Sequence, residues 1–374
     1  MKTLGIYLHI PFCKSKCHYC DFCSFPNRGQ NAKEAYCQTL REQISVRARE
    51  LTDYEVDTVY FGGGTPTSLT SDALCGLLDA VKTHFHVSDR AEITAECNPA
   101  TADGAYFAAM RAAGFNRLSI GVQSLHDSEL HLLGRAHTAL DAEATVRLAR
   151  EAGFSNISMD LMYGIPEQTR QSFAESVRAA CALGVQHVSA YALKIEQGTP
   201  FYKMRHCLTL PDEDAVADMY EDCVAILAEN GLLRYEISNF ARPGYESRHN
   251  LKYWECDEYL GLGAAAHSYL RGVRFAYEDV DAYMQGQPIE AVYEDVTLVR
   301  EQDEYVMLSL RLEKGIDKAA FFARFGKEFD AVYGEKLTPY IRMGFVSDDA
   351  YRCAFTTKGF LVSNSILSDV LDFD

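Results

Sequence analysis

The residues best suited to chemistry are three cysteines near the start of the chain, Cys13, Cys17 and Cys20, spaced as Cys-x3-Cys-x2-Cys. Three thiolates on one short loop can bind three irons of a [4Fe-4S] cubane. The fourth iron then has no protein ligand and stays open to the amino and carboxylate groups of a small molecule. Reductive cleavage of S-adenosylmethionine requires such an open iron. We therefore expect a [4Fe-4S] cluster and S-adenosylmethionine as cofactors.

Two other interpretations of these cysteines remain open. A zinc site could take Cys23 as its fourth ligand, but zinc sites usually pair two separated knuckles, and the sequence contains no second one. The thiols could also be unliganded and buried. A disulfide scaffold is not expected, because the twelve cysteines lie in a large chain with no secretory signal.

The composition narrows the class of protein. The chain has 374 residues, 48% of them hydrophobic, and a formal net charge of −17. This balance disfavours an extended nucleic-acid surface, which needs clustered Lys and Arg. The sequence has no run of about 18 apolar residues to cross a bilayer. We expect a cytoplasmic protein without a transmembrane segment; peripheral membrane contact and a homodimer are left open.

A glycine-rich turn follows the second expected strand, at Phe61-Gly-Gly-Gly-Thr-Pro-Thr67. It is not a P-loop, because no Gly-Lys-Ser/Thr follows, and it lacks the spacing of a dinucleotide fingerprint. Residues without a Cβ let the backbone approach a ligand closely. The turn could be only a tight bend, but its place beside the cysteine loop favours a ligand contact.

Short β-rich runs alternate with segments of helical spacing through the first half of the chain, which is typical of parallel βα units. The pattern predicts an α/β fold with a partial (β/α)6 barrel. The expected strands are Leu4 to Ile10, Val56 to Phe61, Glu92 to Cys97, Arg117 to Val122, Asn156 to Tyr163 and His187 to Ile195.

Polar residues recur at or beyond the ends of these strands, where barrel active sites collect. A zwitterionic ligand with a ribose needs such a mixture of groups. Each residue alone is more often structural, but together they form a plausible ring. The residues are Glu96, Gln123, Arg135, Asp160 and Lys194 with Glu196.

The βα rhythm stops near Leu270. We expect residues 1–271 to form the barrel, with a loop-dominated site over 239–268, and residues 272–298 to form a linker. Residues 299–374 read as a small helical domain, resembling a winged helix, with a hairpin over 346–356 as its wing.

Four motifs resemble the radical S-adenosylmethionine family of oxygen-independent coproporphyrinogen III oxidases. They are Tyr7-Leu-His-Ile-Pro-Phe-Cys, Gly62-Gly-Gly-Thr-Pro-Thr, Gly121-Val-Gln-Ser and Asp160-Leu-Met-Tyr-Gly-Ile-Pro. The resemblance runs over nearly the whole chain. It implies that the three cysteines bind the cluster. It also implies that S-adenosylmethionine contacts Tyr7, Tyr19, Gly63, Gly64, Thr65, Glu96, Gln123, Arg135, Asp160 and Lys194.

Within that family, the chain is more similar to the haem-chaperone branch, HemW. Phe22 stands where the decarboxylating enzymes have a fourth cysteine, and the first strand begins at once, which leaves no room for their N-terminal extension. His249-Asn-Leu-Lys-Tyr-Trp254 matches the haem motif of HemW. The resemblance implies haem as cargo, bound at His249, Asn250, Tyr253 and Trp254 and delivered to haem-requiring, respiratory proteins.

The competing activity is the oxidative decarboxylation of coproporphyrinogen III to protoporphyrinogen IX. Whether S-adenosylmethionine is cleaved during function is left open, and no residue is assigned a catalytic role.

Overall fold

The chain is described by a computed structural model that covers residues 1–295 and 298–371. Its main element is one curved sheet, in which six parallel strands stand in chain order. These six match the expected strands, so the partial barrel is confirmed. They are β1 (Lys2–Ile10), β4 (Tyr54–Gly63), β5 (Val87–Cys97), β6 (Arg117–Gln123), β7 (Ile157–Tyr163) and β8 (His187–Ala192).

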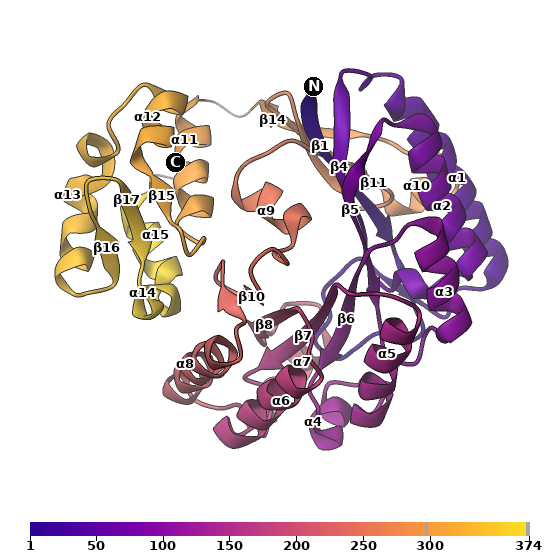
Figure 1. The fold of residues 1–374 in the computed structure, drawn as a ribbon, viewed down its shortest axis with the longest axis horizontal. Coiled ribbons are helices and arrows are strands. Elements are labelled where there is room, and N and C mark those ends of the chain that lie inside the picture. The colour runs from indigo at the N-terminus through magenta and orange to yellow at the C-terminus, as the bar shows by residue number, and fades with distance from the viewer. Residues whose placement is uncertain (296–297, 372–374) are drawn as a thin grey trace.

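Helices cover the convex outer face of this sheet (Figure 1). Each buries one apolar face against the strands; in the first helix, for example, Tyr36, Leu40 and Ile44 are fully buried. The covering helices are α1 (Gln30–Ala48), α2 (Ser71–His84), α3 (Gly104–Ala113), α5 (Ala139–Glu151), α6 (Arg170–Ala182) and α8 (Glu213–Glu229). Two short helices, α4 (Asp127–Leu132) and α7 (Pro200–Met204), lie near the carboxyl ends of the strands.

The stretch 239–268 is more regular than expected. It holds β10 (Asn239–Ala241), α9 (Arg248–Trp254), β11 (Tyr259–Leu262) and β12 (His267–Leu270). Strand β11 pairs in parallel with β1, on the side opposite β4. A Cβ on Gly261 would lie 2.1 Å from the carbonyl oxygen of His267, so this strand accepts only glycine there.

The expected linker at 272–298 also holds regular structure. Strands β13 (Val273–Ala276) and β14 (Ala291–Asp295) extend the sheet, with α10 (Val280–Met284) between them. The reason for the difference is that each strand is short and pairs with its antiparallel neighbour. These strands are stabilised by pairing with their neighbours, so their sequences do not need the alternation of apolar and polar residues by which a strand is recognised.

The C-terminal part is helical with a small sheet of order β15-β17-β16, which contains the expected hairpin. Its strands are β15 (Ile316–Asp317), β16 (Val346–Asp348) and β17 (Arg352–Phe355). Its helices are α11 (Leu298–Ser309), α12 (Lys318–Phe325), α13 (Phe329–Arg342), α14 (Thr357–Leu361) and α15 (Ser363–Val370).

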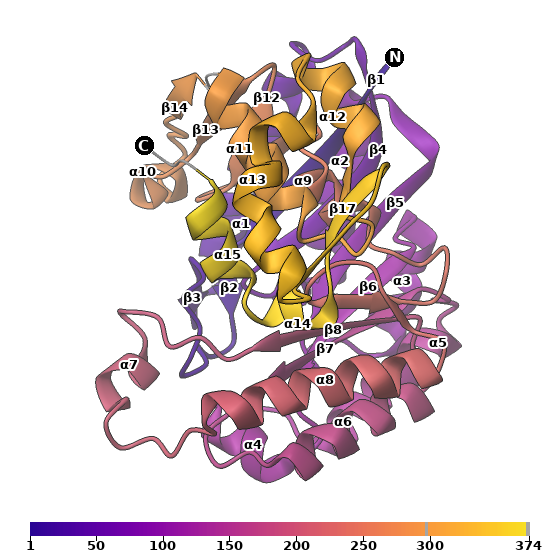
Figure 2. The same ribbon diagram turned by 90° about the vertical axis from the view of Figure 1, so that its left-hand side faces the viewer.

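The C-terminal part faces the concave side of the sheet, and α9 lies between the two (Figure 1). Figure 2 shows α11, α12 and α13 in front of α9 when the molecule is turned by 90°. Arg234 fixes the contact, since its Nε donates to Oε2 of Glu313 at 2.6 Å. The backbone N–H of Ile237 also donates to the carbonyl of Arg311 at 2.9 Å.

Within the described residues, no helix has the length and apolar character needed to cross a membrane.

Candidate functional site

A cavity of about 250 Å³ opens inside the barrel. Its lining brings together the cysteine loop, the glycine-rich turn and the polar residues at the strand ends. Of the predicted cofactor residues, those that line the cavity are Cys13, Cys17, Cys20, Tyr19, Gly63, Gly64, Thr65, Glu96, Gln123, Arg135 and Asp160.

The cysteine loop is closed at its base by two short strands, β2 (Phe12–Cys13) and β3 (Phe25–Pro26), which pair in parallel. The backbone N–H of Phe25 also donates to the carbonyl of Pro11 at 2.6 Å. At the middle of the loop, the N–H of His18 donates to the carbonyl of Leu133 at 3.0 Å. Because both ends and the middle are anchored, the loop presents its thiols to the cavity.

The donor set fits a cluster. The three cysteines are free and partly exposed. Two neighbours contact their sulfurs: Oγ1 of Thr65 lies 3.5 Å from Sγ of Cys13, and Nη1 of Arg135 donates to Sγ of Cys17 at 3.5 Å. The Nε of Arg135 is buried without a hydrogen-bond partner. A cationic guanidinium with an unused donor suits an anionic cluster and a carboxylate-bearing ligand.

The glycine-rich turn lies against the base of the cysteine loop. The N–H of Gly64 donates to the carbonyl of Ile10 at 2.9 Å. A Cβ on Gly64 would lie 2.9 Å from the carbonyl oxygen of Phe12. Gly63 has φ +108°, a conformation that favours glycine. The turn therefore approaches the cysteine loop more closely than any residue with a side chain would allow.

Glu96 places a buried carboxylate beside that turn. Its Oε1 accepts from the hydroxyl of Tyr60 at 2.9 Å, and its Oε2 accepts from the N–H of Gly63 at 3.1 Å. Burial, and then the nearby Asp160, raise the pKa of Glu96 to about 7. This carboxylate can thus gain or lose its charge near neutral pH.

Gln123 and Asp160 face the cavity from the neighbouring strands β6 and β7. Gln123 has φ +72° and its Oε1 accepts from the hydroxyl of Tyr191 at 2.7 Å. Asp160 accepts from the hydroxyl of Ser119 at 3.1 Å, and burial raises its pKa to about 6. These groups can bind the hydroxyls and ammonium of a polar ligand.

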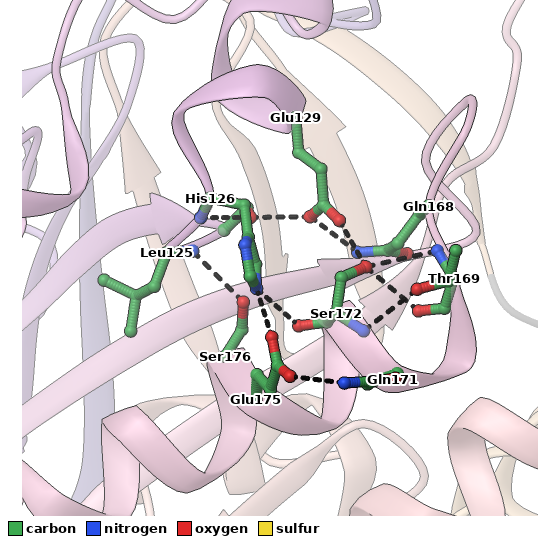
Figure 3. A network of polar contacts seen from close by, with 10 residues as sticks. Leu125, His126, Glu129, Gln168, Thr169, Gln171, Ser172, Glu175 and Ser176 are labelled. Carbon is green, nitrogen blue, oxygen red and sulfur yellow. Dashed lines mark hydrogen bonds and ion pairs between the residues drawn. The ribbon is translucent and has the colours of Figure 1, made fainter.

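A buried polar network anchors the residues that follow Gln123. Figure 3 shows Glu129 of α4 at its centre. The hydroxyls of Ser124 and Ser172 each donate to the Glu129 carboxylate at 2.6 Å, and Nε2 of Gln168 donates at 3.0 Å. Since Ser124 follows Gln123 directly, this network holds the left-handed backbone of Gln123 in place.

Two residues that hold predicted contacts in place were missed in the sequence. Asn98 joins the two residues that contact cysteine sulfurs, because its Nδ2 donates to Oγ1 of Thr65 at 2.7 Å while its Oδ1 accepts from Nη2 of Arg135 at 2.7 Å. Tyr191 holds Gln123. Asn98 lies two residues beyond Glu96 and Tyr191 lies within an expected strand, but neither belongs to a motif that would mark it.

Two predicted cofactor residues do not line the cavity. Lys194 lies in the loop after β8, where its side chain is 82% exposed and forms an ion pair with Glu196 at 2.6 Å. Tyr7 is half-buried behind the lining, where its ring stacks on Tyr60 and its hydroxyl lies 3.1 Å from Nδ1 of His9. The structure therefore places these two apart from the other predicted contacts.

His249, the first residue of the predicted haem motif, is 1% exposed on α9. Its Nδ1 lies 2.8 Å from Oγ1 of Thr58, and its Nε2 lies 2.9 Å from the hydroxyl of Tyr253. Burial lowers the pKa of His249 to about 3. The imidazole is thus neutral, with both nitrogens engaged.

The other residues of the motif have different surroundings. Tyr253 packs edge-on against the ring of Tyr259, with centroids 4.6 Å apart. Asn250 lines the barrel cavity, whereas Trp254 is half-buried at the end of α9. The motif therefore runs from the cavity, at Asn250, to the end of α9, the helix that lies between the barrel and the C-terminal part (Figure 1).

Comparison with known sequences identifies both parts of the chain. The Radical SAM superfamily profile matches residues 7–180, and the HemN C-terminal domain profile matches residues 303–362. The chain is 36% identical to the Heme chaperone HemW of Lactococcus lactis, with coverage of 99% of this chain and 98% of the relative. It is 35% identical to the Heme chaperone HemW of Bacillus subtilis, with coverage of 98% of each chain.

Comparison with solved structures supports the same fold. The structure described as coproporphyrinogen III oxidase (HemN) from Escherichia coli, a radical SAM enzyme, matches with a TM-score of 0.87 and 25% identity. The match covers 100% of this chain and 91% of the other.

Proposed function

Because the chain belongs to the radical SAM family of the Heme chaperones HemW, we propose that it binds haem and transfers it to haem-requiring, respiratory proteins, with a [4Fe-4S] cluster and S-adenosylmethionine in its barrel. The observation that carries the proposal is the full-length similarity to HemW, together with a neutral histidine on α9. A neutral imidazole is the form that ligates iron.

The barrel residues have separate parts in this proposal. Cys13, Cys17 and Cys20 would hold the cluster. Arg135 would pair with the ligand's carboxylate, and Glu96 with its ammonium. When both are bound, the cluster would supply an electron, and S-adenosylmethionine would supply the sulfonium group whose carbon–sulfur bond that electron cleaves.

Haem ligation by His249 would require a local opening of α9. In the described structure, Nε2 of His249 is hydrogen-bonded to Tyr253, so the iron would have to replace that hydroxyl. The half-buried Trp254 at the end of the same helix would supply an aromatic surface for the macrocycle. The hydrogen bond between His249 and Tyr253 therefore competes with haem.

The experiment is an anaerobic haem titration of cluster-reconstituted protein, followed by the Soret band. His249→Ala should weaken haem binding by about tenfold or more and change the spectrum. Tyr253→Phe should bind haem at least as tightly as the wild type, because it removes the competing hydroxyl. His86→Ala, at an exposed histidine, serves as the matched control and should bind normally.

Binding that is indifferent to His249 would exclude this residue as the ligand. Weakened binding in Tyr253→Phe as well as in His249→Ala would instead mean that the pair only supports the fold of α9. Thermal unfolding of each variant separates this case, because a purely structural effect would follow stability.

The structural match to coproporphyrinogen III oxidase favours a second candidate, porphyrinogen decarboxylation. One residue counts against this candidate. Phe22, 68% exposed at the cavity, occupies the place where the decarboxylating enzymes have a fourth cysteine. Anaerobic incubation with coproporphyrinogen III, S-adenosylmethionine and a reductant tests it. Protoporphyrinogen formation above that of a Cys17→Ala control would replace the chaperone proposal with the enzyme.

A further inference from the structure

The barrel cavity continues below the proposed S-adenosylmethionine contacts. Alternate residues of β6 line it, namely Arg117, Ser119, Gly121 and Gln123. The first and last of these are six residues apart, which places their Cα atoms about 20 Å apart in an extended strand. The cavity therefore has an upper end at the cysteine loop and a lower end at Arg117.

Residues of four strands line the part of the cavity below the predicted contacts and define a lower chamber: Arg117 of β6, Ser158 of β7, His187 of β8 and Asn239 of β10. Ser158 lies opposite His187 in the sheet, Arg117 lies two residues before Ser119, which faces Ser158, and Asn239 lies opposite Ser189. The predicted S-adenosylmethionine contacts that line the cavity do not include any of them.

Arg117 is 1% exposed and carries unused donors. Two of its nitrogens, Nε and Nη2, are buried without a hydrogen-bond partner. Across residues 1–295 and 298–371, no ion pair involving Arg117 is formed. A buried guanidinium without a carboxylate partner lowers stability unless a ligand compensates its charge. Its position at a cavity wall indicates where that ligand would lie.

The other residues of the lower chamber supply no negative charge to Arg117; the carboxylates of Glu96 and Asp160, which interact with it electrostatically, lie among the predicted S-adenosylmethionine contacts. His187 is hydrogen-bonded through both nitrogens, to Ser158 at 2.7 Å and to the hydroxyl of Tyr235 at 2.8 Å. Burial and the charge of Arg117 lower its pKa well below the usual value, so the ring is neutral. The Oδ1 of Asn239 is another buried atom without a partner. The chamber thus holds one cation among neutral polar groups.

We propose that the lower chamber is a second ligand site, in which the guanidinium of Arg117 binds the carboxylate of a small molecule or of a carboxylated side arm. The fork of donors on a guanidinium matches a carboxylate with two hydrogen bonds. A monoanion fits better than a dianionic phosphate, because Glu96 and Asp160 face the same cavity. This inference does not depend on haem binding.

The test measures thermal unfolding of the full chain in increasing sodium propionate, with sodium phosphate and sodium chloride at matched ionic strength. The wild type should show a saturable rise in Tm with propionate alone. Arg117→Gln should lose the response. Arg117→Lys, which keeps the charge without the fork, should need about tenfold more propionate for half of the effect.

The matched control is Arg234→Gln. Arg234 is also buried, with 7% of its side chain exposed, but it is paired with Glu313. Its loss should lower Tm and leave the propionate response intact. Without added carboxylate, Arg117→Gln should lower Tm less than Arg234→Gln does, since Arg117 has no ion-pair partner to lose.

Several results would overturn the inference. They are an equal response to phosphate, a response that survives in Arg117→Gln, or no response in the wild type. Repeating the titration with saturating S-adenosylmethionine distinguishes the source of the carboxylate. Independent effects support a separate site, whereas competition would assign Arg117 to the carboxylate of S-adenosylmethionine itself.

Discussion

The side-chain oxygen of Asn98 accepts a hydrogen bond from Nη2 of Arg135 at 2.7 Å. Through its amide nitrogen, the same side chain also holds Thr65 at 2.7 Å. One neutral residue therefore sets the distance between the glycine-rich turn and the guanidinium that contacts the cysteine loop.

Asn98→Ala should lower S-adenosylmethionine affinity about tenfold, because a hydrogen bond to a charged group contributes about 1.5–3 kcal/mol. Calorimetric titration of cluster-reconstituted protein measures it. Asn116→Ala is the control, since the Asn116 side chain binds backbone groups of β5, at Ile93 and Ala91, and does not line the cavity as the described residues form it. That control should lose stability and keep its affinity; equal affinities for the wild type and Asn98→Ala would contradict the assignment.

Gly64→Ala should reduce both stability and cluster content. The added Cβ would meet backbone atoms of Phe12 and Ile10 at about 3 Å, so the base of the cysteine loop must move. We expect a loss of about 1–3 kcal/mol in the free energy of unfolding and less iron per chain. Gly29→Ala has open space around its Cβ and should be neutral. Denaturant unfolding and iron analysis distinguish the two.

Glu96 should make S-adenosylmethionine binding depend on pH. Its pKa of about 7 means that the carboxylate gains charge between pH 6 and pH 8, with Asp160 and Arg117 nearby. Affinity for the ligand's ammonium should rise by up to about tenfold over that range. Glu96→Gln should flatten the profile. A wild-type profile without a slope would remove Glu96 from this role.

The titration of Glu96 should lower the stability of the fold as pH rises, whereas it should raise ligand affinity. Because the pKa of Glu96 is higher in the folded chain than the ordinary value of 4.5, the folded state binds more protons between pH 4.5 and 7. Its contribution to the free energy of unfolding is therefore lost as pH rises through that window. Urea unfolding of wild type and Glu96→Gln should diverge there.

His249 should make the fold sensitive to acid. Its pKa of about 3 in the folded state lies below the ordinary value of 6.5, so the unfolded chain binds the extra proton. Stability should fall as pH drops below 6.5, by about 1.4 kcal/mol from this residue between pH 7.5 and 5.5. His249→Asn should show a shallower decline. His9, His137 and His187 are shifted in the same direction and should add to the decline.

Glu129→Gln should destabilise the network drawn in Figure 3. The Glu129 carboxylate accepts three hydrogen bonds. The amide NH2 group of a glutamine would face at least one of these donating groups and could not accept its hydrogen bond. We expect a loss of about 1–3 kcal/mol. Affinity for S-adenosylmethionine should fall as well if the network positions Gln123. Gln171→Ala, at the exposed edge of the same network, is the control.

Much of the barrel could be predicted because its strands are short buried apolar runs, and a helix with one apolar face separates each strand from the next. The predicted site residues came together for a similar reason, since parallel strands end at one edge of the sheet. Cys13 and Glu96, for example, are 83 residues apart in sequence and line one cavity.

The remaining features depend on contacts between distant segments. Strand β8 ends at Ala192, three residues earlier than the expected strand, which leaves Lys194 in an exposed loop. Strand β11 has four residues and owes its place to pairing with β1. The burial of His249 depends on Thr58, which is 191 residues away. No local sequence pattern predicts the end of β8, the pairing of β11 or the burial of His249.

The position of β1 between β4 and β11 has a consequence for synthesis of the chain. The strand that carries the cysteine loop can pair on its second side only after Leu262 has left the ribosome. At about 5–20 residues per second, this takes roughly 13–50 s after β1 itself emerges. During that interval, one edge of β1 is unpaired.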